Sequence, residues 1–308
     1  MATHDTEALP MTERVASESI VRQYYELTKP GISQMVAMTT LTGYYLAIPT
    51  DLVSYATTSG NWLHAVNTLV GTLAISSGSC VVNHIMEKDV DARMKRTASR
   101  PIPSGLISTT HASIFAAALT IGGAALLATT NPLTLVMAIA TWLFYVVVYT
   151  PMKQRSSLAV IVGGIPGALP FAGGWTAVRG TFDPMAFALF AILFFWQLPH
   201  FYALSWMYRT DYRAGGVVLR SISDETGSTL AWQMILTSVL TLAAAVVPTL
   251  LGATGYLYLV GAGLLGAWLV VESIRFRTNA DAGAARRVLL TSYAVLMGLV
   301  LLMFLDKQ

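Results

Sequence analysis

The sequence predicts an all-α, polytopic membrane protein built as a bundle or ring of nine transmembrane helices. Of its 308 residues, 55% are hydrophobic and only 11% are charged, which is about half the charge of an ordinary soluble domain. The apolar residues are gathered in long blocks, and blocks of about 20 residues are long enough to cross a bilayer as helices. Nearly all of the basic residues near these blocks can be placed on one side of the membrane, as the positive-inside rule requires.

Nine blocks qualify as spans by their length and apolarity. They cover residues 32–49, 62–84, 111–129, 133–150, 158–177, 184–205, 229–249, 254–273 and 286–305. The tight turn "TTNP" joins the third span to the fourth, so these two helices are expected to be antiparallel neighbours. Nine spans place the two termini on opposite sides of the membrane.

The distribution of Lys and Arg gives the orientation. If the N-terminus is inside, only Arg179 and Lys307 remain outside. We therefore expect an integral protein of the bacterial inner (plasma) membrane, whose N-terminus and active-site loops are cytoplasmic and whose C-terminus is outside. Residues 1–28 are interpreted as a flexible cytoplasmic tail and residues 29–308 as the membrane domain. The net charge of +3 gives no reason to expect nucleic acid as a partner.

The end of the second span carries the most informative residues, in the stretch "NHIMEKDVDARMKRTASR". Asn83, Glu87 and Asp91 are spaced four apart, so on a helix their side chains lie on one face, one turn above another. A row of one amide and two carboxylates suits Mg²⁺, which binds to one or two carboxylates and to phosphate oxygens of a substrate. Asp89 falls on the opposite face and is the weaker candidate. A loop whose charges only anchor the topology would explain the cations here but not this row.

Cations that could hold the phosphate of such a substrate follow directly. The stretch itself contributes Arg93, Lys95, Arg96 and Arg100, and "RPIP" then stops any helix. The fourth span reaches the same side at "YTPMKQR", where Lys153 and Arg155 could add cations around a diphosphate. Taken alone, these last two are ordinary positive-inside residues.

A third polar group lies in "FFWQLPHFYALSWMYRTDYRAGG". On a continuous helix Gln197, His200 and Asp211 share one face. A His within a span is costly unless it faces the interior of the bundle, so His200 is a functional candidate. The alternative is a core histidine whose hydrogen bonds are satisfied. His84, beside the Asn-Glu-Asp row, is a weaker candidate.

Taken together, these segments resemble the UbiA-type intramembrane prenyltransferases, and more closely their haem O synthase branch. The matching segments are spread over nearly the whole membrane domain: "LTKPGI", "NHIMEKDVDARMKRTASRPIP", "YTPMKQR", "GGIPGALP", "WQLPHFYALSW" and "DYRAGG". The resemblance implies a ring of nine helices, which agrees with the count of spans. It also implies an enzyme that transfers farnesyl from farnesyl diphosphate to the 2-vinyl group of haem b, with water addition, giving haem O for haem-copper oxidases.

The resemblance also implies roles for individual residues and partners. Mg²⁺ is the implied cofactor, and haem A synthase or oxidase assembly factors are the implied protein partners. The implied ligands are Asn83, Glu87 and Asp91 for the metal, with Asp211 from a second acidic motif; Lys29, Arg96, Arg100, Lys153 and Arg155 for the diphosphate; and His200, Gln197 and His84 for haem.

The chain departs from the family pattern in two places. The second acidic motif usually has two or more aspartates, whereas only Asp211 stands here, so the ligands of a second metal are open. "GGVVLRSI" replaces a usual Pro-Met-Leu-Pro stretch and adds Arg220 as an extra cation. Two alternative functions therefore remain: a prenyltransferase of the same fold acting on a quinone precursor or another tetrapyrrole, and a non-catalytic haem or lipid transporter.

Overall fold

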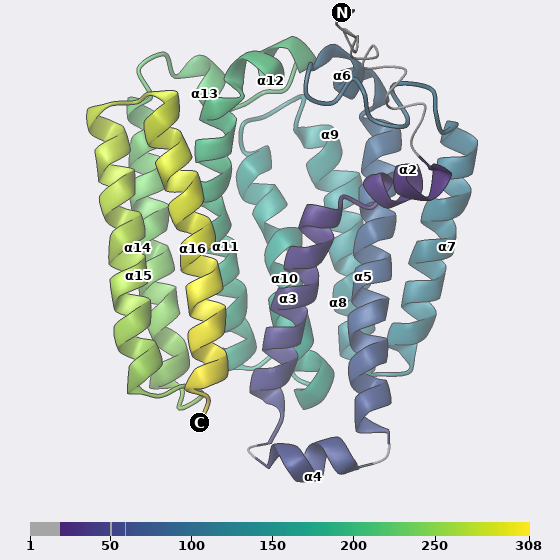
Figure 1. The fold of residues 1–308 in the computed structure, drawn as a ribbon, viewed down its shortest axis with the longest axis vertical. Helices are drawn as coiled ribbons and strands as arrows, with labels where there is room; N and C mark the ends of the chain where they lie inside the picture. Colours follow the sequence, from purple (N-terminus) through teal and green to yellow (C-terminus); the bar gives the residue numbers. More distant parts are fainter. Residues whose placement is uncertain (1–18, 50, 59) are drawn as a thin grey trace, which may run out of the picture.

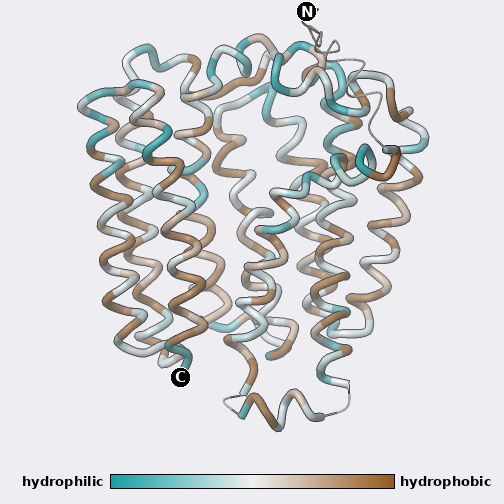
Figure 2. The backbone as a smooth tube through the Cα atoms, viewed as in Figure 1, coloured by the Kyte–Doolittle hydropathy of each residue, from teal (hydrophilic) through white to brown (hydrophobic). Residues whose placement is uncertain are grey.

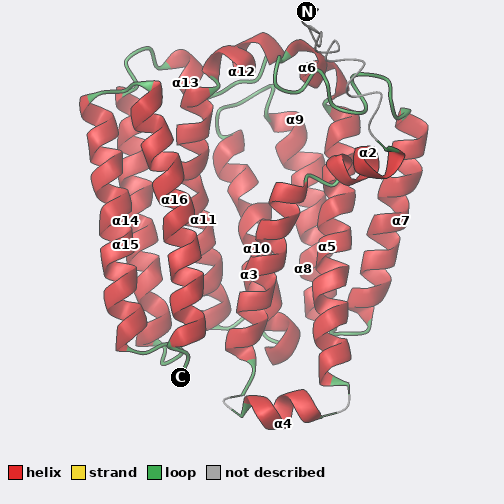
Figure 3. Cartoon of the chain, viewed as in Figure 1, coloured by secondary structure: helices red, strands yellow, loops and turns green. Residues whose placement is uncertain are grey.

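A computed structural model of the protein describes residues 19–49, 51–58 and 60–308, and within this part every regular element is a helix (Figure 3). The long helices are α3 (Pro30–Ala47), α5 (Asn61–Met86), α7 (Thr109–Ala128), α8 (Pro132–Leu143), α10 (Ala159–Arg179), α11 (Pro184–Met207), α14 (Ser228–Leu250), α15 (Tyr256–Thr278) and α16 (Ala282–Leu305). The short ones are α2 (Ile20–Leu27), α4 (Leu52–Thr57), α6 (Lys88–Arg93), the π-helix η1 (Phe144–Tyr149), α9 (Thr150–Met152), α12 (Arg209–Gly215) and α13 (Arg220–Ser223).

Each of the nine predicted spans corresponds to one long helix of the structure. In the described part of the chain, eight helical segments have the length and apolarity needed to cross a membrane, with α8, η1 and α9 forming one of them over 132–152. The ninth, α3, is 18 residues long, but its Thr, Tyr and Gln residues make it more polar than the others. The predicted all-helical membrane fold is confirmed, and the apolar middle and polar ends of the bundle are visible in Figure 2.

The long helices close into a ring. Each packs against the next in the order α3, α5, α7, α8, α10, α11, α14, α15 and α16, and α16 returns to α3. The most extensive contacts across the ring, between α3 and α10 and between α11 and α16, divide it into two lobes. The first lobe holds α3 to α10 and the second holds α11 to α16 (Figure 1). The helices α7 and α8 are antiparallel neighbours, as the "TTNP" turn predicts.

The described helix α2 lies within the range that the sequence assigns to the N-terminal tail. Residues 1–18 of that range lie outside the described residues. Ser19 caps α2, and Leu27 is fully buried in a core cluster with Val81 and Ile102. The packed part of the protein therefore begins before residue 29, because an apolar residue in this segment has partners on α5 and in the loop after α6.

The ring is closed at the end opposite α2 by the C-terminus (Figure 1). The Lys307 ammonium donates to the main-chain oxygens of Tyr45 and Ile48, at 2.8 and 2.7 Å, and it lies 4.6 Å from the centre of the Tyr45 ring. Tyr45 lies in the last turn of α3 and Ile48 directly follows the helix, at an end where the carbonyl oxygens lack the usual helical partners. Lys307 thus ties the end of α16 to the end of α3.

The helices α3 and α10, which close the first lobe, approach each other closely enough that only glycine fits. A Cβ atom on Gly174 of α10 would lie 2.0 Å from the main-chain oxygen of Thr40, and one on Gly43 of α3 would lie 2.1 Å from that of Phe171. Both obstacles are backbone atoms, which cannot move aside without shifting a helix. Small residues at such crossings are how membrane helices gain packing contacts.

We expect Gly174→Val to separate α3 from α10 and to lower the free energy of unfolding by about 1–3 kcal/mol or more, the usual range for overpacking. Thermal unfolding of the purified protein in detergent measures this. Gly122→Val on α7 is the matched control, because nothing lies within 4 Å of a Cβ placed there. Equal unfolding midpoints for the two variants would contradict the close crossing.

Candidate active site

Most of the polar residues singled out by the sequence gather at one end of the ring, whereas Gln197 and His200 lie within α11. This end carries the short helices α2, α6, α12 and α13, and it lies opposite the C-terminus (Figure 1). The last turns of α5 and the segments that fold over them hold these polar residues in place.

The predicted row of Asn83, Glu87 and Asp91 lies on one face, as expected. The helix α5 breaks at Glu87, whose φ and ψ are −94° and 10°, yet the hydrogen-bond pattern continues through the break. The Glu87 N–H donates to Asn83 O at 2.9 Å, and the Asp91 N–H donates to Glu87 O at 2.7 Å. All three side chains are buried, whereas Asp89 is exposed.

One cation contacts each member of this row. Lys29 donates to Asn83 Oδ1, Lys153 Nζ lies 2.8 Å from Glu87 Oε1, and an Arg100 nitrogen lies 2.8 Å from Asp91 Oδ2. Buried carboxylates require such partners, because an unpaired buried charge is very costly. The three pairs place amide and carboxylate oxygens next to cations at this end of α5.

The three cations come from separate segments, each shaped to deliver its side chain. Lys29 precedes Pro30 and has a φ of 51°, a left-handed conformation that costs a non-glycine residue about 1–3 kcal/mol. Arg100 reaches back over nine residues because the chain reverses after α6. The Thr97 hydroxyl donates to Asp91 O at 2.8 Å and fixes this reversal. The helix therefore ends at Arg93, before the predicted "RPIP" stop.

The pKa values of these groups reflect burial and pairing together. Burial lowers the pKa of Lys29 to about 8, and neighbouring cations add to this effect while Glu87 and Cys80 oppose it. Burial alone would lower the pKa of Lys153, but Glu87 beside it raises the pKa above its ordinary value. Burial alone would raise the pKa of Glu87, and Lys153 and Lys29 outweigh this, so its pKa is lowered. Glu87 is thus held ionised.

The donor set suits Mg²⁺ only in combination with a substrate. The described residues hold no group of three or more His, Cys, Asp and Glu side chains that could bind a metal ion. Glu87 and Asp91 with the Asn83 amide leave several positions of an octahedral shell for phosphate oxygens and water, as is usual for Mg²⁺. His84 borders this row: its Nδ1 lies 3.8 Å from Asp91 Oδ2, and neither ring nitrogen has a hydrogen bond with the described residues.

The other two predicted diphosphate cations are placed differently. The Arg96 guanidinium lies over the rings of Tyr208 and Tyr212, 5.4 and 5.8 Å from their centres. Arg155 is exposed at the same end of the ring and forms no ion pair with the described residues. Neither contacts the row of Asn83, Glu87 and Asp91 directly.

The second acidic motif has the same helix–break–helix shape as the first. The helix α11 breaks at Tyr208, as α5 breaks at Glu87, and α12 follows. When the two breaks are superposed in sequence, Leu204, Tyr208 and Tyr212 take the positions of the amide and the two carboxylates. Asp211 is offset by one residue from this face.

Asp211 instead holds a loop. Its carboxylate accepts from the backbone N–H groups of Lys95 and Arg96, at 3.1 and 3.2 Å. It therefore anchors the segment that carries Arg96 over the two tyrosines. The nearby Val217 and Leu219, from the unusual "GGVVLRSI" stretch, pack on Val90 of α6 and fasten α12 to the first motif.

Gln197 and His200 both lie on the buried side of α11, but they contact different neighbours. The Gln197 amide donates to Gly164 O of α10 at 2.8 Å. His200 Nδ1 lies 2.9 Å from Ser292 Oγ of α16. The break at Tyr208 means that these residues and Asp211 do not lie on one continuous helix.

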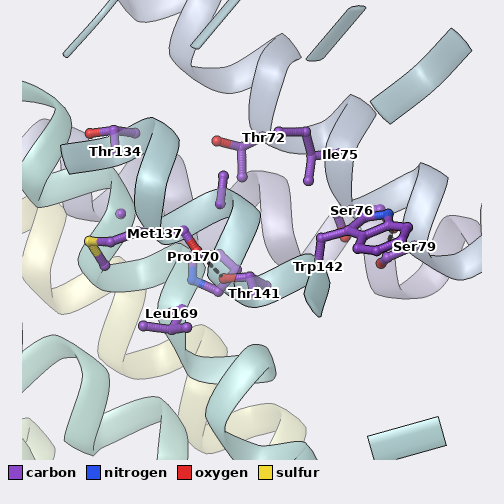
Figure 4. A pocket seen from close by; sticks show the side chains of 12 residues that line it. Thr72, Ile75, Ser76, Ser79, Thr134, Met137, Thr141, Trp142, Leu169 and Pro170 are labelled. Carbon is purple, nitrogen blue, oxygen red and sulfur yellow. Dashed lines mark hydrogen bonds between the residues drawn. The ribbon is translucent and has the colours of Figure 1, made fainter. Parts of the chain in front are cut away.

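A cavity lies among α5, α8 and α10, on the side of α5 that carries Asn83. Its wall on α5 includes Thr72, Ser76 and Ser79, and Ser79 is one helical turn before Asn83. Figure 4 shows these side chains facing Trp142, Thr141 and Pro170. The empty space between these side chains is about 410 Å³ when open solvent is counted, and little of it is enclosed.

Sequence reasoning missed Thr150. Its hydroxyl accepts from the Asn83 amide at 3.0 Å and donates to Tyr145 O at 2.8 Å, and so it orients the amide oxygen toward Lys29. The π-helix η1 directly precedes it. Pro151 is the signal that could have indicated this, because proline removes a helical hydrogen bond and widened turns often mark functional sites.

The sequence profile of the UbiA prenyltransferase family matches residues 36–303. The chain belongs to this family. Among curated proteins, it is 37% identical to a protoheme IX farnesyltransferase of Solibacter usitatus, over 93% of this chain and 99% of the relative. It is 36% identical to a protoheme IX farnesyltransferase of Koribacter versatilis, over 94% of each chain. Membership of the family makes it an integral membrane enzyme of the prenyl-transferring class.

Solved structures share the fold at low identity. A digeranylgeranylglyceryl phosphate synthase superposes with a TM-score of 0.75 at 18% identity, over 92% of this chain and 97% of that one. A UbiA homologue from Archaeoglobus fulgidus, bound to GPP and Mg²⁺, superposes with a TM-score of 0.64 at 14% identity, over 92% and 99% of the two chains.

We expect Glu87→Gln and Asp91→Asn each to slow prenyl transfer by a factor on the order of 10²–10³, the loss typical of removing one electrostatic group from an active site. Release of diphosphate from a prenyl diphosphate in the presence of Mg²⁺ measures this. Asp89→Asn is the matched control and should stay within about twofold of the unchanged protein. Full activity in both row variants would mean that the row is structural.

Proposed function

We propose that the protein transfers a farnesyl group from farnesyl diphosphate to the 2-vinyl group of haem b, with water addition, and so produces haem O. The observation that carries this proposal is the buried row of Asn83, Glu87 and Asp91 with one cation against each member. The curated relatives at 36–37% identity, which carry the name protoheme IX farnesyltransferase, support the choice of donor and acceptor.

The residues of the row and their cations would act on the diphosphate. Mg²⁺, held by Glu87, Asp91 and the Asn83 oxygen, would neutralise the leaving group when bound. Lys29, Lys153 and Arg100 would exchange their carboxylate or amide partners for phosphate oxygens, which are equally good charge-assisted acceptors. Arg96 and Arg155 lie further out, where they would attract the diphosphate from the cytoplasmic side.

The reaction itself proceeds by cleavage of the allylic C–O bond, and the electron pair leaves with the diphosphate. The π electrons of the vinyl group form the new carbon–carbon bond to the farnesyl cation. Water adds to the carbon next to the porphyrin ring and gives up a proton. The chain's part is to hold the diphosphate, align the two substrates and keep other water from the cation.

The farnesyl chain would occupy the cavity among α5, α8 and α10. This cavity lies one helical turn below Asn83 along the same face of α5, so a chain that enters it keeps its diphosphate beside the row. Trp142 and Met137 supply apolar surface, and the threonine and serine hydroxyls of the wall bond largely within their own helices.

The acceptor would lie against α11. His200, Gln197 and His84 remain the candidates for haem contacts, and Asp211 would act by holding the Arg96 loop in place. We also propose the bacterial inner membrane as the location, with the site end of the ring facing the cytoplasm and the C-terminus outside. Haem A synthase or an oxidase assembly factor would receive the product.

Membranes containing the protein, supplied with haem b, farnesyl diphosphate and Mg²⁺, should yield haem O, identified by chromatography and mass. A parallel panel offers a quinone precursor and a second tetrapyrrole as acceptors. Prenylation of one of these compounds in place of haem b would show that haem b is not the acceptor and that this compound is. Well-folded protein that releases no diphosphate with any acceptor would refute catalysis and favour a transporter.

We expect Ala138→Phe, which places a ring in the cavity, to raise the KM for farnesyl diphosphate about tenfold or more, by excluding part of the chain. The KM for geranyl diphosphate, which is one isoprene unit shorter, should rise less. Steady-state kinetics with both donors measure the ratio of the KM for farnesyl diphosphate to the KM for geranyl diphosphate. An exposed apolar substitution on the same helix, Val136→Phe, is the control, and a ratio that moves equally in both variants would exclude this cavity as the chain site.

A further inference from the structure

A buried hydroxyl on α16, that of Ser292, contacts His200, the histidine proposed to contact haem. Ser292 is fully buried, and its Oγ lies 2.9 Å from His200 Nδ1 and 2.6 Å from the Leu289 carbonyl oxygen. Two oxygens at 2.6 Å, one of them a carbonyl, require a proton between them. The only proton available is that of the serine hydroxyl, so the hydroxyl donates its hydrogen bond to the Leu289 carbonyl oxygen.

The hydrogen bond from Ser292 to Leu289 determines which nitrogen of the His200 imidazole carries a proton. Because the Ser292 proton points at Leu289, the Ser292 oxygen can only accept from His200, and His200 must carry its proton on Nδ1. A cationic imidazole would be costly at this depth in the membrane, so Nε2 then carries a lone pair. No hydrogen bond joins Nε2 to any residue in the described ranges. An unprotonated ring nitrogen can coordinate a metal, but it cannot donate to a carboxylate.

The rings around His200 form a surface suited to a flat ligand. Trp196 stacks on the imidazole with centroids 5.3 Å apart, and its indole N–H donates to the main-chain oxygen of Ser292 at 2.6 Å. Tyr293 and Phe201 meet the imidazole edge-on at 4.8 and 5.5 Å. Tyr293 is 44% exposed and Phe201 37% exposed, so this cluster opens outward, at the level of the bilayer.

We infer that Ser292 is a positioning residue, which holds His200 as the Nδ1–H tautomer and so presents Nε2 to the iron of the haem substrate. The inference rests on the proposed function and makes it more specific, because it chooses iron coordination over a hydrogen bond to a propionate. It follows a general pattern, in which the second nitrogen of a metal-binding histidine donates to an oxygen acceptor. Losing such an acceptor typically weakens metal affinity by 10–100-fold.

The test is a titration of the purified full chain in detergent with haem b and, separately, with iron-free protoporphyrin IX. Ser292→Ala should weaken haem b binding by about 10-fold or more and shift its Soret band, while the affinity for protoporphyrin IX stays unchanged. Ser292→Thr, which keeps the hydroxyl, should bind haem b like the unchanged protein. The KM for haem b should rise in Ser292→Ala, and that for farnesyl diphosphate should not.

Three further samples decide between this role and simple helix packing. Ser238→Ala removes another buried hydroxyl that joins two helices, at 2.9 Å from Ser273, and it should leave haem b binding intact. His200→Ala should lose the Soret band of the complex and regain it with added imidazole. In the His200→Ala background, Ser292→Ala should have no further effect on haem b affinity.

Equal losses for haem b and protoporphyrin IX would overturn the inference, as would equal losses in Ser238→Ala and Ser292→Ala. If Ser292→Ala does not fold, His200→Ala still decides, because retention of the complete Soret band in that variant excludes iron coordination. These outcomes are separate from the proposed function. Formation of haem O with an unchanged Soret band in His200→Ala would sustain the reaction and remove only the role of Ser292.

Discussion

The ion pairs at the end of α5 are the constraint on which the first lobe depends. Glu87 and Asp91 are buried charges, and removing one partner of such a pair costs about 3–5 kcal/mol. Their partners, Lys153 and Arg100, come from segments that are far apart in the sequence. Formation of these ion pairs therefore brings the end of η1–α9 and the loop after α6 to one place. The buried carboxylates thus stabilise the folded arrangement of the site and are also part of it.

The same pairs explain how a site this charged can be stable and still bind its substrate. With Asn83 neutral, the two carboxylates face three cations, Lys29, Lys153 and Arg100, so the group carries a small positive excess. A diphosphate brings more negative charge than one Mg²⁺ neutralises, and that difference matches the excess. In the proposed function, binding would exchange partners: Mg²⁺ would replace the cations on the carboxylates, and phosphate oxygens would replace the carboxylates on the cations. Neither carboxylate would be left unpaired in either state.

The periodic features of the site were predictable from sequence, and the long-range ones were not. The spacing of Asn83, Glu87 and Asp91 and the lengths of the nine spans follow from the helical repeat, which local sequence encodes. Which cation meets which oxygen depends on chain reversals fixed by single hydroxyls, such as that of Thr97. The position of Asp211 was not predictable either, because its face depends on a break at Tyr208 that shifts the register by an amount set by packing. Thr150 lies 67 positions from Asn83, and no local pattern links them.

The division into lobes places the proposed sites for the prenyl donor and for the acceptor in different parts of the ring. The row of Asn83, Glu87 and Asp91 and the cavity below it belong to the first lobe, whereas His200 and Ser292 join α11 to α16 in the second. The lobes meet where α16 packs on α3 and where α10 packs on α11, and at the second of these contacts Gln197 donates to Gly164 O. A Cβ on Gly167 would lie 2.3 Å from the Gln197 oxygen, so glycine is what allows this amide to sit against α10. If donor and acceptor bind to different lobes, their relative position is set by this contact, and Gln197 acts on the reaction by aligning the two helices even where it touches neither substrate.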